Sequence, residues 1–165
     1  MPIDATYCSE EIYLRSALQN DSQSLWEWRN DPQTCAMSQN SAPVSWEDHS
    51  RWFEASLKNP QRLILIGCSI INGKIGMCRF DSVIQSAEVS INMNPVHRGK
   101  GLSKPLLSGC IQFFLKQTPL SLRATIHKNN APSQRLFTQC AFIKKSEQDS
   151  FYFYERNAIG LDSLP

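Results

Sequence analysis

Two glycines alternate with two basic residues in a short segment that follows an alternating apolar stretch. Gly99 and Gly101 can adopt positive φ angles and leave the backbone open to close approach, so successive N–H groups can turn towards one point. Arg98 and Lys100 add positive charge beside that point. A helix that follows would add the positive end of its dipole. These residue types in this order predict a binding site for a pyrophosphate group.

Two common nucleotide-binding loops do not match this segment. The phosphate loop GxxxxGK[ST] needs a lysine after its second glycine, whereas Lys100 precedes Gly101. The dinucleotide fingerprint GxGxxG needs a third glycine where Lys104 stands. The sequence therefore argues against a nucleoside triphosphatase and against a dinucleotide-binding enzyme.

A second segment, residues 130–142, has the pattern of a helix with a defined start. Asn130 is a favourable N-cap residue, and Pro132 is compatible with the first helical turn. Apolar residues follow at helical spacing, at Leu136, Phe137 and Cys140. The segment therefore predicts a helix that begins at about residue 130.

The two segments together resemble the acyl-CoA-binding motifs of the GNAT N-acetyltransferases. Arg98-x-x-Gly101-x-Ser103 is similar to R/Q-x-x-G-x-G/A. Residues 130–142 are similar to N-x-x-[AS]-x-x-[LF]-[YF]-x-x-x-G-F. The motifs follow the order of that family and are joined by a predicted strand over 120–127.

Three positions depart from these motifs. Ser103 replaces a Gly or Ala, Ala141 replaces a Gly, and Phe137 replaces the Tyr that often serves as general acid in the family. The resemblance implies acetyl-CoA as the co-substrate and no metal. It implies cofactor contacts from Ile91, Met93, Arg98, Gly99, Lys100, Gly101, Leu102, Ser103, Asn130, Ser133 and Phe137.

Acetyl transfer from a thioester to an amine needs a neutral amine, a stabilised oxyanion and a proton for the leaving thiolate. Glu88 resembles the glutamate that acts as general base in several GNAT enzymes, directly or through water; the alternative is a solvated strand carboxylate. Phe137 has no proton to donate, so another group must protonate the thiolate. The candidates are Ser133, Tyr152, Tyr154 and solvent. The resemblance implies that a backbone N–H near Met93, at the end of the predicted strand over 87–93, binds the oxyanion.

The acceptor amine is expected to bind to the first third of the chain, which is rich in aromatic and hydrogen-bonding side chains. Aromatic faces can stack a base, and Arg can clamp a phosphate. With residues 76–81, this part resembles the amino-sugar GNAT enzymes of the pseudaminic acid pathway. Those enzymes acetylate the 4-amino group of UDP-4-amino-4,6-dideoxy-N-acetyl-altrosamine. The resemblance implies substrate contacts from Arg29, His49, Trp52, Arg79 and Asp81.

Three alternatives to this interpretation stay open. The tryptophans of the first third could pack two helices together beside a solvated arginine. A ribosomal-protein-type N-terminal acetyltransferase has a similar first strand and first helix. A GNAT-like module could also bind acyl-CoA without turnover, which the departures at Ser103 and Phe137 would allow.

The bulk composition narrows the setting. With 165 residues and 41% hydrophobic content, the chain suits one domain, residues 1–165, with a buried core. Its formal charge of +2 is the small difference between 17 basic and 15 acidic residues, so the composition does not indicate a nucleic-acid partner. Neither a basic leader nor an apolar run of about 18 residues is present. We therefore expect a cytoplasmic protein that binds no membrane, as a monomer or a homodimer.

The cysteines and histidines show no metal-binding spacing. The six cysteines include no C-x-x-C pair, and the three histidines are scattered. Most of the cysteines are therefore expected to be small core residues in a reducing compartment.

Several local signals define the elements that must position these residues. Asp21 can cap a helix that Pro32 would stop, and Ser45 can cap a second helix. Asn72-Gly73 is the commonest signal for a type I′ hairpin.

The order of elements predicts an α/β (α+β) protein with a mixed sheet covered by helices. Expected strands cover residues 12–17, 63–71, 74–80, 87–93, 120–127, 142–145 and 151–155. Expected helices cover residues 22–30, 45–58, about 103–116, and a last stretch that begins at about 130. This order is similar to the GNAT fold, which has a mostly antiparallel sheet of about seven strands and four flanking helices. Its two central parallel strands, here 87–93 and 120–127, splay apart to admit the pantetheine arm.

Overall fold

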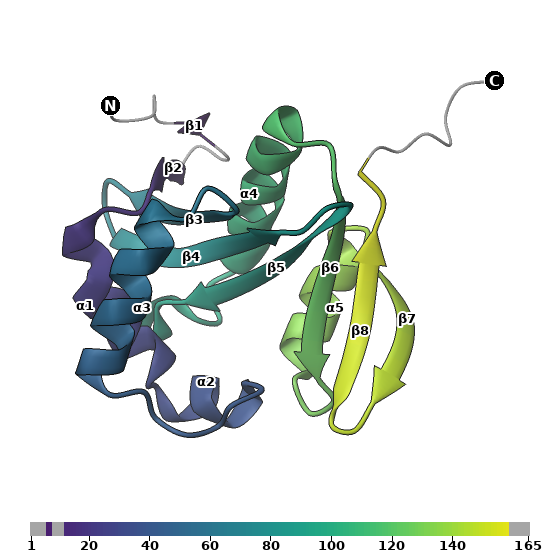
Figure 1. Cartoon of the computed structure of the whole chain (residues 1–165), viewed down its shortest axis with the longest axis horizontal. Helices are drawn as coiled ribbons and strands as arrows, with labels where there is room; N and C mark the ends of the chain where they lie inside the picture. The colour runs from purple at the N-terminus through teal and green to yellow at the C-terminus, as the bar shows by residue number, and fades with distance from the viewer. Residues whose placement is uncertain (1–5, 8–11, 159–165) are drawn as a thin grey trace.

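One mixed β-sheet runs through the molecule and carries helices on both faces (Figure 1). The computed structural model describes residues 6–7 and 12–158. The strands follow the order β1-β2-β3-β4-β5-β6-β8-β7, and among them only β5 and β6 pair in parallel. Their bounds are β1 (Thr6–Tyr7), β2 (Tyr13–Ser16), β3 (Arg62–Ser69), β4 (Gly73–Ser82), β5 (Ser86–Met93), β6 (Ser121–His127), β7 (Ile143–Gln148) and β8 (Phe151–Arg156).

The helices divide between the two faces of the sheet. They are α1 (Ser22–Arg29), α2 (Pro32–Met37), α3 (Trp46–Lys58), α4 (Ser103–Gln117) and α5 (Ala131–Gln139). Alternate residues of β3 show the division, because Ile64 and Ile66 pack with α1 and α3 whereas Leu65 packs with α4. A strand buried on both faces reads as a continuous apolar run, which is the sequence of β3. Within residues 12–158, none of the helices combines the length and the apolarity that a bilayer span needs.

The predicted fold class is confirmed. The sheet is mixed and mostly antiparallel, and α1, α3, α4 and α5 flank it as the four long helices of the described chain. Each predicted element is present, with ends that differ by a few residues. The short elements β1 and α2 are additional, as are two 3-10 helical turns, η1 (Gln19–Asp21) and η2 (Pro95–His97).

Pro32 begins α2 and does not merely stop α1. Asp31 caps α2, because its side chain accepts a hydrogen bond from the Thr34 N–H at 3.1 Å. Pro32 fits the first turn, where a helix needs no N–H donor. The local signals for this start are in the sequence, but six residues are too few to show a helical period.

Asp21 does not cap α1 with its side chain as predicted. The carboxylate is fully buried and forms ion pairs with Arg15 Nη1 at 2.7 Å and Lys74 Nζ at 2.8 Å. Burial raises its pKa, but hydrogen bonds from Arg15, Lys74 and the Leu18 N–H outweigh that effect and lower the pKa to about 2. Asp21 therefore joins β2 and β4 to the start of α1.

The β3–β4 hairpin differs from the predicted type I′ turn. That turn needs positive φ at both central residues, and of the pair Asn72-Gly73 only Gly73 has it, with φ of 66°. Ser69 pairs directly with Gly73, so the loop has three residues. A three-residue loop closed by a left-handed glycine is the next most common hairpin.

The two parallel strands β5 and β6 pair over only a short distance. The paired positions are Ser86 with Ser121, Ala87 with Leu122, and Glu88 with Arg123. Beyond them the strands diverge, and Figure 1 shows the gap between their lower ends. The predicted splay of the central strands is therefore present.

The end of α5 is a Schellman motif. The Phe142 N–H donates to the Phe137 carbonyl at 3.0 Å, and the Ala141 N–H donates to the Thr138 carbonyl at 3.1 Å. Ala141 has a φ of 67°, in the left-handed region that glycine adopts most easily. Alanine therefore holds the backbone shape for which the usual glycine of this motif is suited.

Candidate active site

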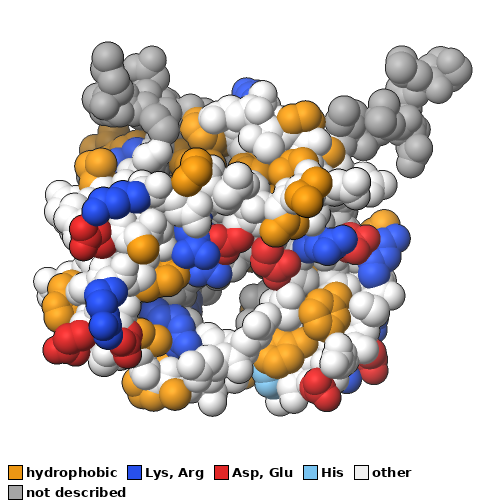
Figure 2. Space-filling view, in the orientation of Figure 1, with side chains coloured by type: hydrophobic (Ala, Val, Ile, Leu, Met, Phe, Trp, Pro, Cys, Tyr) orange, Lys and Arg blue, Asp and Glu red, His pale blue; other side chains and the backbone are white. Residues whose placement is uncertain are grey.

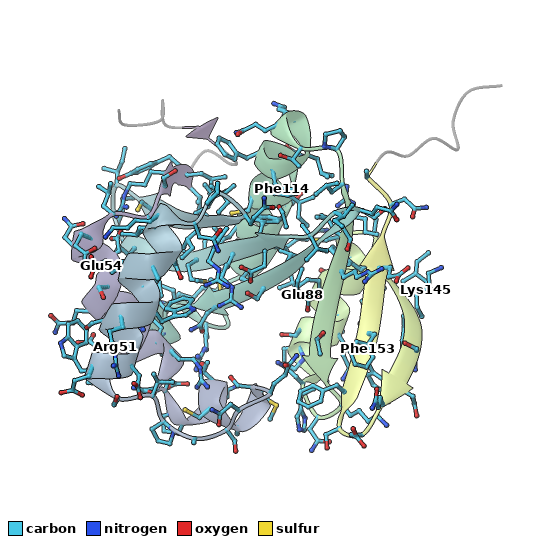
Figure 3. All side chains as sticks on the ribbon, viewed as in Figure 1. Arg51, Glu54, Glu88, Phe114, Lys145 and Phe153 are labelled. Carbon is cyan, nitrogen blue, oxygen red and sulfur yellow. The ribbon has the colours of Figure 1, made fainter. Side chains whose placement is uncertain are left out.

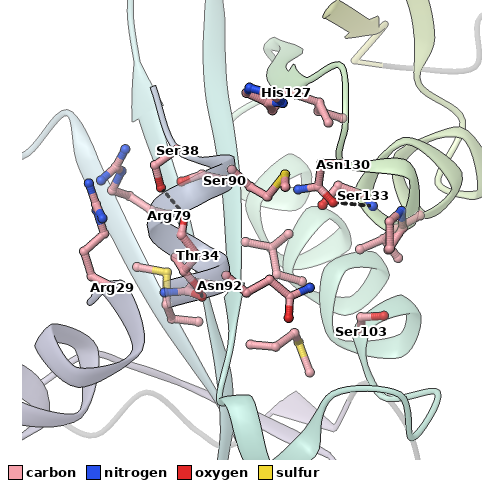
Figure 4. A pocket seen from close by; sticks show the side chains of 18 of the residues that line it. Arg29, Thr34, Ser38, Arg79, Ser90, Asn92, Ser103, His127, Asn130 and Ser133 are labelled. Atoms are coloured by element: carbon pink, nitrogen blue, oxygen red, sulfur yellow. Dashed lines mark hydrogen bonds between the residues drawn. The ribbon is translucent and has the colours of Figure 1, made fainter. Parts of the chain in front are cut away.

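A cleft of about 1230 Å³ lies where β5 and β6 separate. The space-filling view shows this hollow between the α1–α3 side and the β6–β8 side of the molecule (Figure 2). One wall comes from β5 and the starts of α4 and α5, and we call it the cofactor wall because the predicted cofactor residues lie on it. The other wall comes from α1, α2, α3 and Arg79 of β4, and we call it the acceptor wall because the predicted acceptor contacts lie there. Figure 4 shows the cleft from close by, with polar side chains on both walls.

The backbone of β5 contributes hydrogen-bonding groups to this cleft. The Asn94 N–H donates to the Ile75 carbonyl at 2.9 Å, so Asn94 and every second residue before it point their backbone groups at β4. Val89, Ile91 and Met93 therefore direct theirs towards β6, from which β5 has separated. These N–H and C=O groups are available to an extended ligand and to an oxyanion.

The glycine-rich loop has the backbone geometry that the sequence predicts. Gly99 and Gly101 have φ angles of 71° and 73°, and no atom lies within 4 Å of an added Cβ at either position. Glycine is therefore required by the backbone conformation rather than by a lack of space. α4 begins at Ser103, so its first N–H groups face the same cleft.

The start of α5 forms the other end of the cofactor wall. The Asn130 side chain caps the helix, because its Oδ1 accepts from the Ser133 N–H at 3.2 Å (Figure 4). The amide NH₂ of Asn130 is then the group left for a ligand. Phe137 lines the cleft at 3% exposure, and its ring lies 5.0 Å from that of Phe142. Phe137 packs the wall and offers no proton.

The structure brings most of the predicted cofactor residues to one cleft. Its lining includes Ile91, Met93, Arg98, Gly99, Gly101, Leu102, Ser103, Asn130, Ser133 and Phe137. Lys100 is exposed at the loop and does not line the cleft.

Arg98 makes contacts that the sequence did not predict. Its guanidinium is bound to the first turn of α2 on the opposite wall. Nη1 donates to Asp31 Oδ2 at 2.7 Å, and Nη2 donates to Thr34 Oγ1 at 2.7 Å. In this arrangement Arg98 forms an ion pair with the Asp31 carboxylate.

Glu88 lies at the apex of the splay, where β5 and β6 last pair. It is half-buried and lines the cleft, and among residues 12–158 no side chain forms a hydrogen bond or ion pair with its carboxylate. Figure 3 shows Glu88 between the two halves of the molecule. A carboxylate in this position can take a proton from an amine that enters the cleft.

Of the candidate proton donors, Ser133 lies in the cleft and the two tyrosines do not. Tyr154 is 6% exposed within the apolar core, and this burial raises the pKa of its phenol. Tyr152 packs against the same core. Ser133 and solvent therefore stay the candidate proton donors, and Tyr154 packs in the core.

Trp52 and Arg79 lie together on the acceptor wall. The guanidinium carbon of Arg79 lies 5.6 Å from the centre of the Trp52 ring, and that of Arg62 lies 5.5 Å from it. Both arginines form ion pairs with Asp81, at 2.8 Å for Arg79 Nε. Trp52 and Arg79 line the cleft, whereas Asp81 lies behind them. Asp81 therefore orients Arg79 and does not line the cleft itself.

His49 has a structural role in the same wall. It is 3% exposed, and its Nε2 lies 2.8 Å from the Ser22 carbonyl oxygen. Its ring stacks near Phe53 at a centroid distance of 5.8 Å, and burial lowers its pKa. His49 therefore packs α3 against α1 and also lines the cleft, so its role as a nucleotide contact stays a prediction.

Arg29 lines the cleft at the end of α1. Its Nη2 donates to the Asn40 carbonyl at 2.6 Å, and its Nη1 contacts Cys35 Sγ at 3.4 Å. None of the carboxylates described in the structure forms an ion pair with it. Figure 4 shows Arg29 and Arg79 on the same side of the cleft.

Several polar residues of the cleft escaped the sequence analysis. Ser90 and Asn92 follow Glu88 on the same face of β5, Thr34 comes from α2, and Ser38 is the C-cap of α2. The alternation of β5 could have identified the first two, because Glu88 fixes which face is polar. The other two depend on α2, which the periodicity did not reveal.

The charged side chains of the lining are mostly basic. They are Arg29, Arg79, Arg98, Arg135, Asp48 and Glu88. Asp48 pairs with Arg51 at 2.6 Å, which leaves Glu88 as the carboxylate without a described partner. Within the described ranges, no three His, Cys, Asp or Glu side chains gather as a metal ion would require. Cys8 lies outside the described residues, and the remaining cysteines are buried and free.

Comparisons with known proteins agree with this geometry. Residues 11–143 match the family described as "Acetyltransferase (GNAT) domain". No curated protein sequence matches the chain. Among solved structures, spermidine N-acetyltransferase from Vibrio cholerae, in complex with CoA and spermine, superposes with a TM-score of 0.78. It is 14% identical, over 89% of this chain and 94% of that one.

Two further structures are similar to the same extent. A domain from Methanocaldococcus jannaschii has a TM-score of 0.78 and 23% identity, over 89% of this chain and 98% of that one. The ribosomal L7/L12 alpha-N-protein acetyltransferase RimL, in complex with coenzyme A, has a TM-score of 0.78 and 13% identity, over 93% and 98%. At these identities the structures support the fold, and the family match covers most of the chain. The chain therefore belongs to the GNAT family and is an acetyl-CoA-dependent N-acetyltransferase.

Proposed function

We propose that the enzyme acetylates the primary amine of an anionic acceptor, and that this acceptor is a nucleotide-linked amino sugar. The observation that carries the proposal is the basic character of the acceptor wall, where Arg29 and Arg79 face the cleft and Glu88 is the carboxylate without a partner. An acceptor with a diphosphate would find two arginine side chains there. The 4-amino group of UDP-4-amino-4,6-dideoxy-N-acetyl-altrosamine is the specific candidate.

Trp52 supports a nucleotide over a simple anion. Its ring lines the cleft beside Arg79. Trp52 can therefore contact a planar base while the adjacent Arg79 contacts a phosphate of the same nucleotide. Asp81 holds Arg79 in place, which limits the loss of side-chain entropy on binding.

The proposed mechanism gives each proton transfer to a residue of the cleft or to solvent. Acetyl-CoA supplies the activated acetyl group, whose thioester carbon bonds to the acceptor nitrogen as the C–S bond breaks. Glu88 removes the proton that this nitrogen must lose, directly or through a water. The backbone N–H groups of Ile91 and Met93 stabilise the negative charge on the carbonyl oxygen. Ser133 or solvent gives a proton to the leaving sulfur.

A protein N-terminus is the second candidate acceptor. RimL acts on ribosomal L7/L12 and has the same fold over nearly the whole chain. A peptide with acidic residues near its amino end could use the same arginines. A polyamine fits less well, because its cationic groups would approach Arg29 and Arg79.

We also propose a cytoplasmic location. The cysteines at 35, 68, 78, 110 and 140 are all buried and free, as is usual in a reducing compartment.

The decisive experiment offers the pure protein acetyl-CoA with a panel of amines. The panel contains UDP-4-amino sugars, the same sugars without the nucleotide, acidic and neutral peptides, and spermidine. Thiol release measures turnover, and mass spectrometry identifies the acetylated product. We expect release with the nucleotide sugar and little with the free sugar. A product on a peptide terminus or on spermidine would overturn the acceptor assignment.

Two arginine variants test the basis of that assignment. Arg79→Gln should raise the acceptor KM by about tenfold or more, because a charge-assisted contact is worth about 1.5–3 kcal/mol. Arg62→Gln is the matched control, because Arg62 contacts the same tryptophan and the same aspartate but does not line the cleft. Equal KM values for the two variants would argue against a direct role for Arg79.

A further inference from the structure

The contact between Arg98 and α2 joins two functional walls of the cleft. Arg98 lies at the start of the glycine-rich loop, and its side chain is 27% exposed. Asp31, at 20% exposure, accepts from it at 2.7 Å, and Thr34 Oγ1 accepts at 2.7 Å. Asp31 and Arg98 are 67 positions apart, so the contact is a tertiary one between the cofactor loop and the acceptor wall.

α2 depends on such contacts for its position. It has six residues, too few for a helix to be stable through its own hydrogen bonds. Its further polar contacts are the Asp31 cap and three weaker ones at 3.4 Å, which join Thr34 Oγ1 to Asn92 Oδ1 on β5, Gln33 Oε1 to Arg98 Nη1, and Cys35 Sγ to Arg29. The bidentate guanidinium of Arg98 holds the cap and Thr34 together, which a single hydrogen bond cannot do.

α2 in turn fixes part of the acceptor wall. Cys35 Sγ lies 3.4 Å from both Nη1 and the carbonyl oxygen of Arg29. Met37 and Ser38 line the cleft directly. A shift of α2 would therefore move Arg29, which lies in the wall that faces the acceptor.

We propose that Arg98 is a positioning residue that couples the cofactor loop to the acceptor wall through Asp31 and Thr34. When the pyrophosphate of acetyl-CoA binds, it fixes the loop at Gly99 and Gly101. Because Arg98 belongs to this loop and bonds to α2, the position of α2 is then fixed as well. Binding of one substrate then prepares the site of the other. This coupling goes beyond the identity of the acceptor, and it can be measured without one.

A direct role for Arg98 at the phosphate makes the opposite prediction for Asp31. If the guanidinium were a phosphate ligand, Asp31 would compete for it, and removal of the Asp31 charge would tighten coenzyme A binding. If Arg98 couples the loop to α2, the same change breaks the link and does not tighten binding. Asp31→Asn is well suited to the comparison, because asparagine is also a good N-cap and keeps α2 capped.

Hydrogen exchange with coenzyme A alone tests the coupling. The reporters are the Thr34 N–H, bonded to Asp31 Oδ2, and the Cys35 N–H, bonded to the Asp31 carbonyl at 2.9 Å. In the wild-type protein we expect saturating coenzyme A to slow exchange over 33–38 by about fivefold or more. In Arg98→Gln and Asp31→Asn this slowing should disappear, while protection of the 98–103 loop persists.

Lys100→Gln is the matched control, because it removes the same charge from the same loop at a side chain outside the cleft. It should leave the slowing over 33–38 intact once coenzyme A is saturating. Arg98→Lys keeps the charge but not the two-pronged geometry, and it should lose most of the coupling. This variant guards against a folding defect caused by the loss of charge.

Two results would overturn the proposal. One is an absence of slowing over 33–38 in the wild-type protein that binds coenzyme A. The other is tighter coenzyme A binding by Asp31→Asn together with weaker binding by Arg98→Gln, measured by calorimetry. Neither result depends on the acceptor, so failure of the amine panel and failure of this coupling are distinguishable.

Discussion

Glu88 lies opposite Arg123 at the last position that β5 and β6 share, and the strands separate directly after it. Its carboxylate therefore stands at the closed end of the splay, beside the β5 N–H groups that can bind an oxyanion. Glu88→Gln should lower kcat by about 100-fold, the usual contribution of a general base, and change the Kd of acetyl-CoA little. Steady-state kinetics and calorimetry measure the two quantities.

Glu155→Gln is the control for this change. Glu155 is on β8, and its Oε1 lies 3.7 Å from Nε of Arg123 on β6. Glu155 does not line the cleft, so its replacement should leave kcat near the wild-type value. Unchanged turnover in Glu88→Gln would remove Glu88 from the mechanism.

The glycine-rich loop offers a second prediction. Alanine at Gly101 must adopt a φ of 73°, at a cost of about 1–2 kcal/mol. A loop that shifts to relieve this strain must return to bind the pyrophosphate, so Gly101→Ala should raise the Kd of coenzyme A by about fivefold or more. Isothermal titration measures this value.

Gly73→Ala separates strain from binding. Gly73 has a similar φ of 66° and the same free space, but it lies in the β3–β4 hairpin outside the cleft. It should lower the free energy of unfolding by about 1 kcal/mol and leave the Kd of coenzyme A unchanged. Equal Kd values for the two variants would mean that the Gly101 backbone does not hold the cofactor.

The parts of the site predicted from the sequence are those set by neighbouring residues. Gly99 and Gly101 require a particular φ, Asn130 caps the helix that it begins, and β5 alternates between two faces. These features depend on a few consecutive residues. Motif spacing therefore located the segments that line one wall of the cleft and the order of elements along the chain.

The parts that were not predicted depend on contacts between distant segments. Arg98 binds Asp31, which is 67 positions away, and His49 is buried because α3 packs on α1. Tyr154 faces the core because of the register of β8 with β6. The sequence pattern predicts on which face of its helix or strand a residue lies. It does not predict which other helix or strand packs against that face.

Asp21 predicts a pH dependence of stability. Its pKa is about 2 in the folded protein and near its ordinary value of 3.8 in the unfolded chain. The folded state therefore favours the ionised form, and the resulting stabilisation is complete above about pH 4. It is lost as the pH falls from about 4 to about 2 and amounts to roughly 2 kcal/mol. Urea unfolding across this range measures it.

Asp21→Asn should remove this component of the pH dependence. It should also lower stability at pH 7 by at least about 2 kcal/mol, because Arg15 and Lys74 lose their counter-charge. Asp149→Asn, at an exposed turn, is the control and should change neither quantity much. A wild-type slope that persists in Asp21→Asn would assign the acid sensitivity to other carboxylates.

Ala141 predicts a stabilising substitution. It holds a φ of 67° at the end of α5, where glycine avoids the clash of Cβ with the backbone. Ala141→Gly should raise the free energy of unfolding by about 1 kcal/mol and the Tm by about 2–4 °C. The Phe142 to Phe137 hydrogen bond and the packing of their rings should be unaffected, because neither involves the Ala141 side chain.

Ala55→Gly, within α3, is the opposite control and should lower the free energy of unfolding by about 1 kcal/mol. Equal losses of stability in both variants would show that the strain at Ala141 is smaller than the flexibility that glycine adds to the unfolded chain.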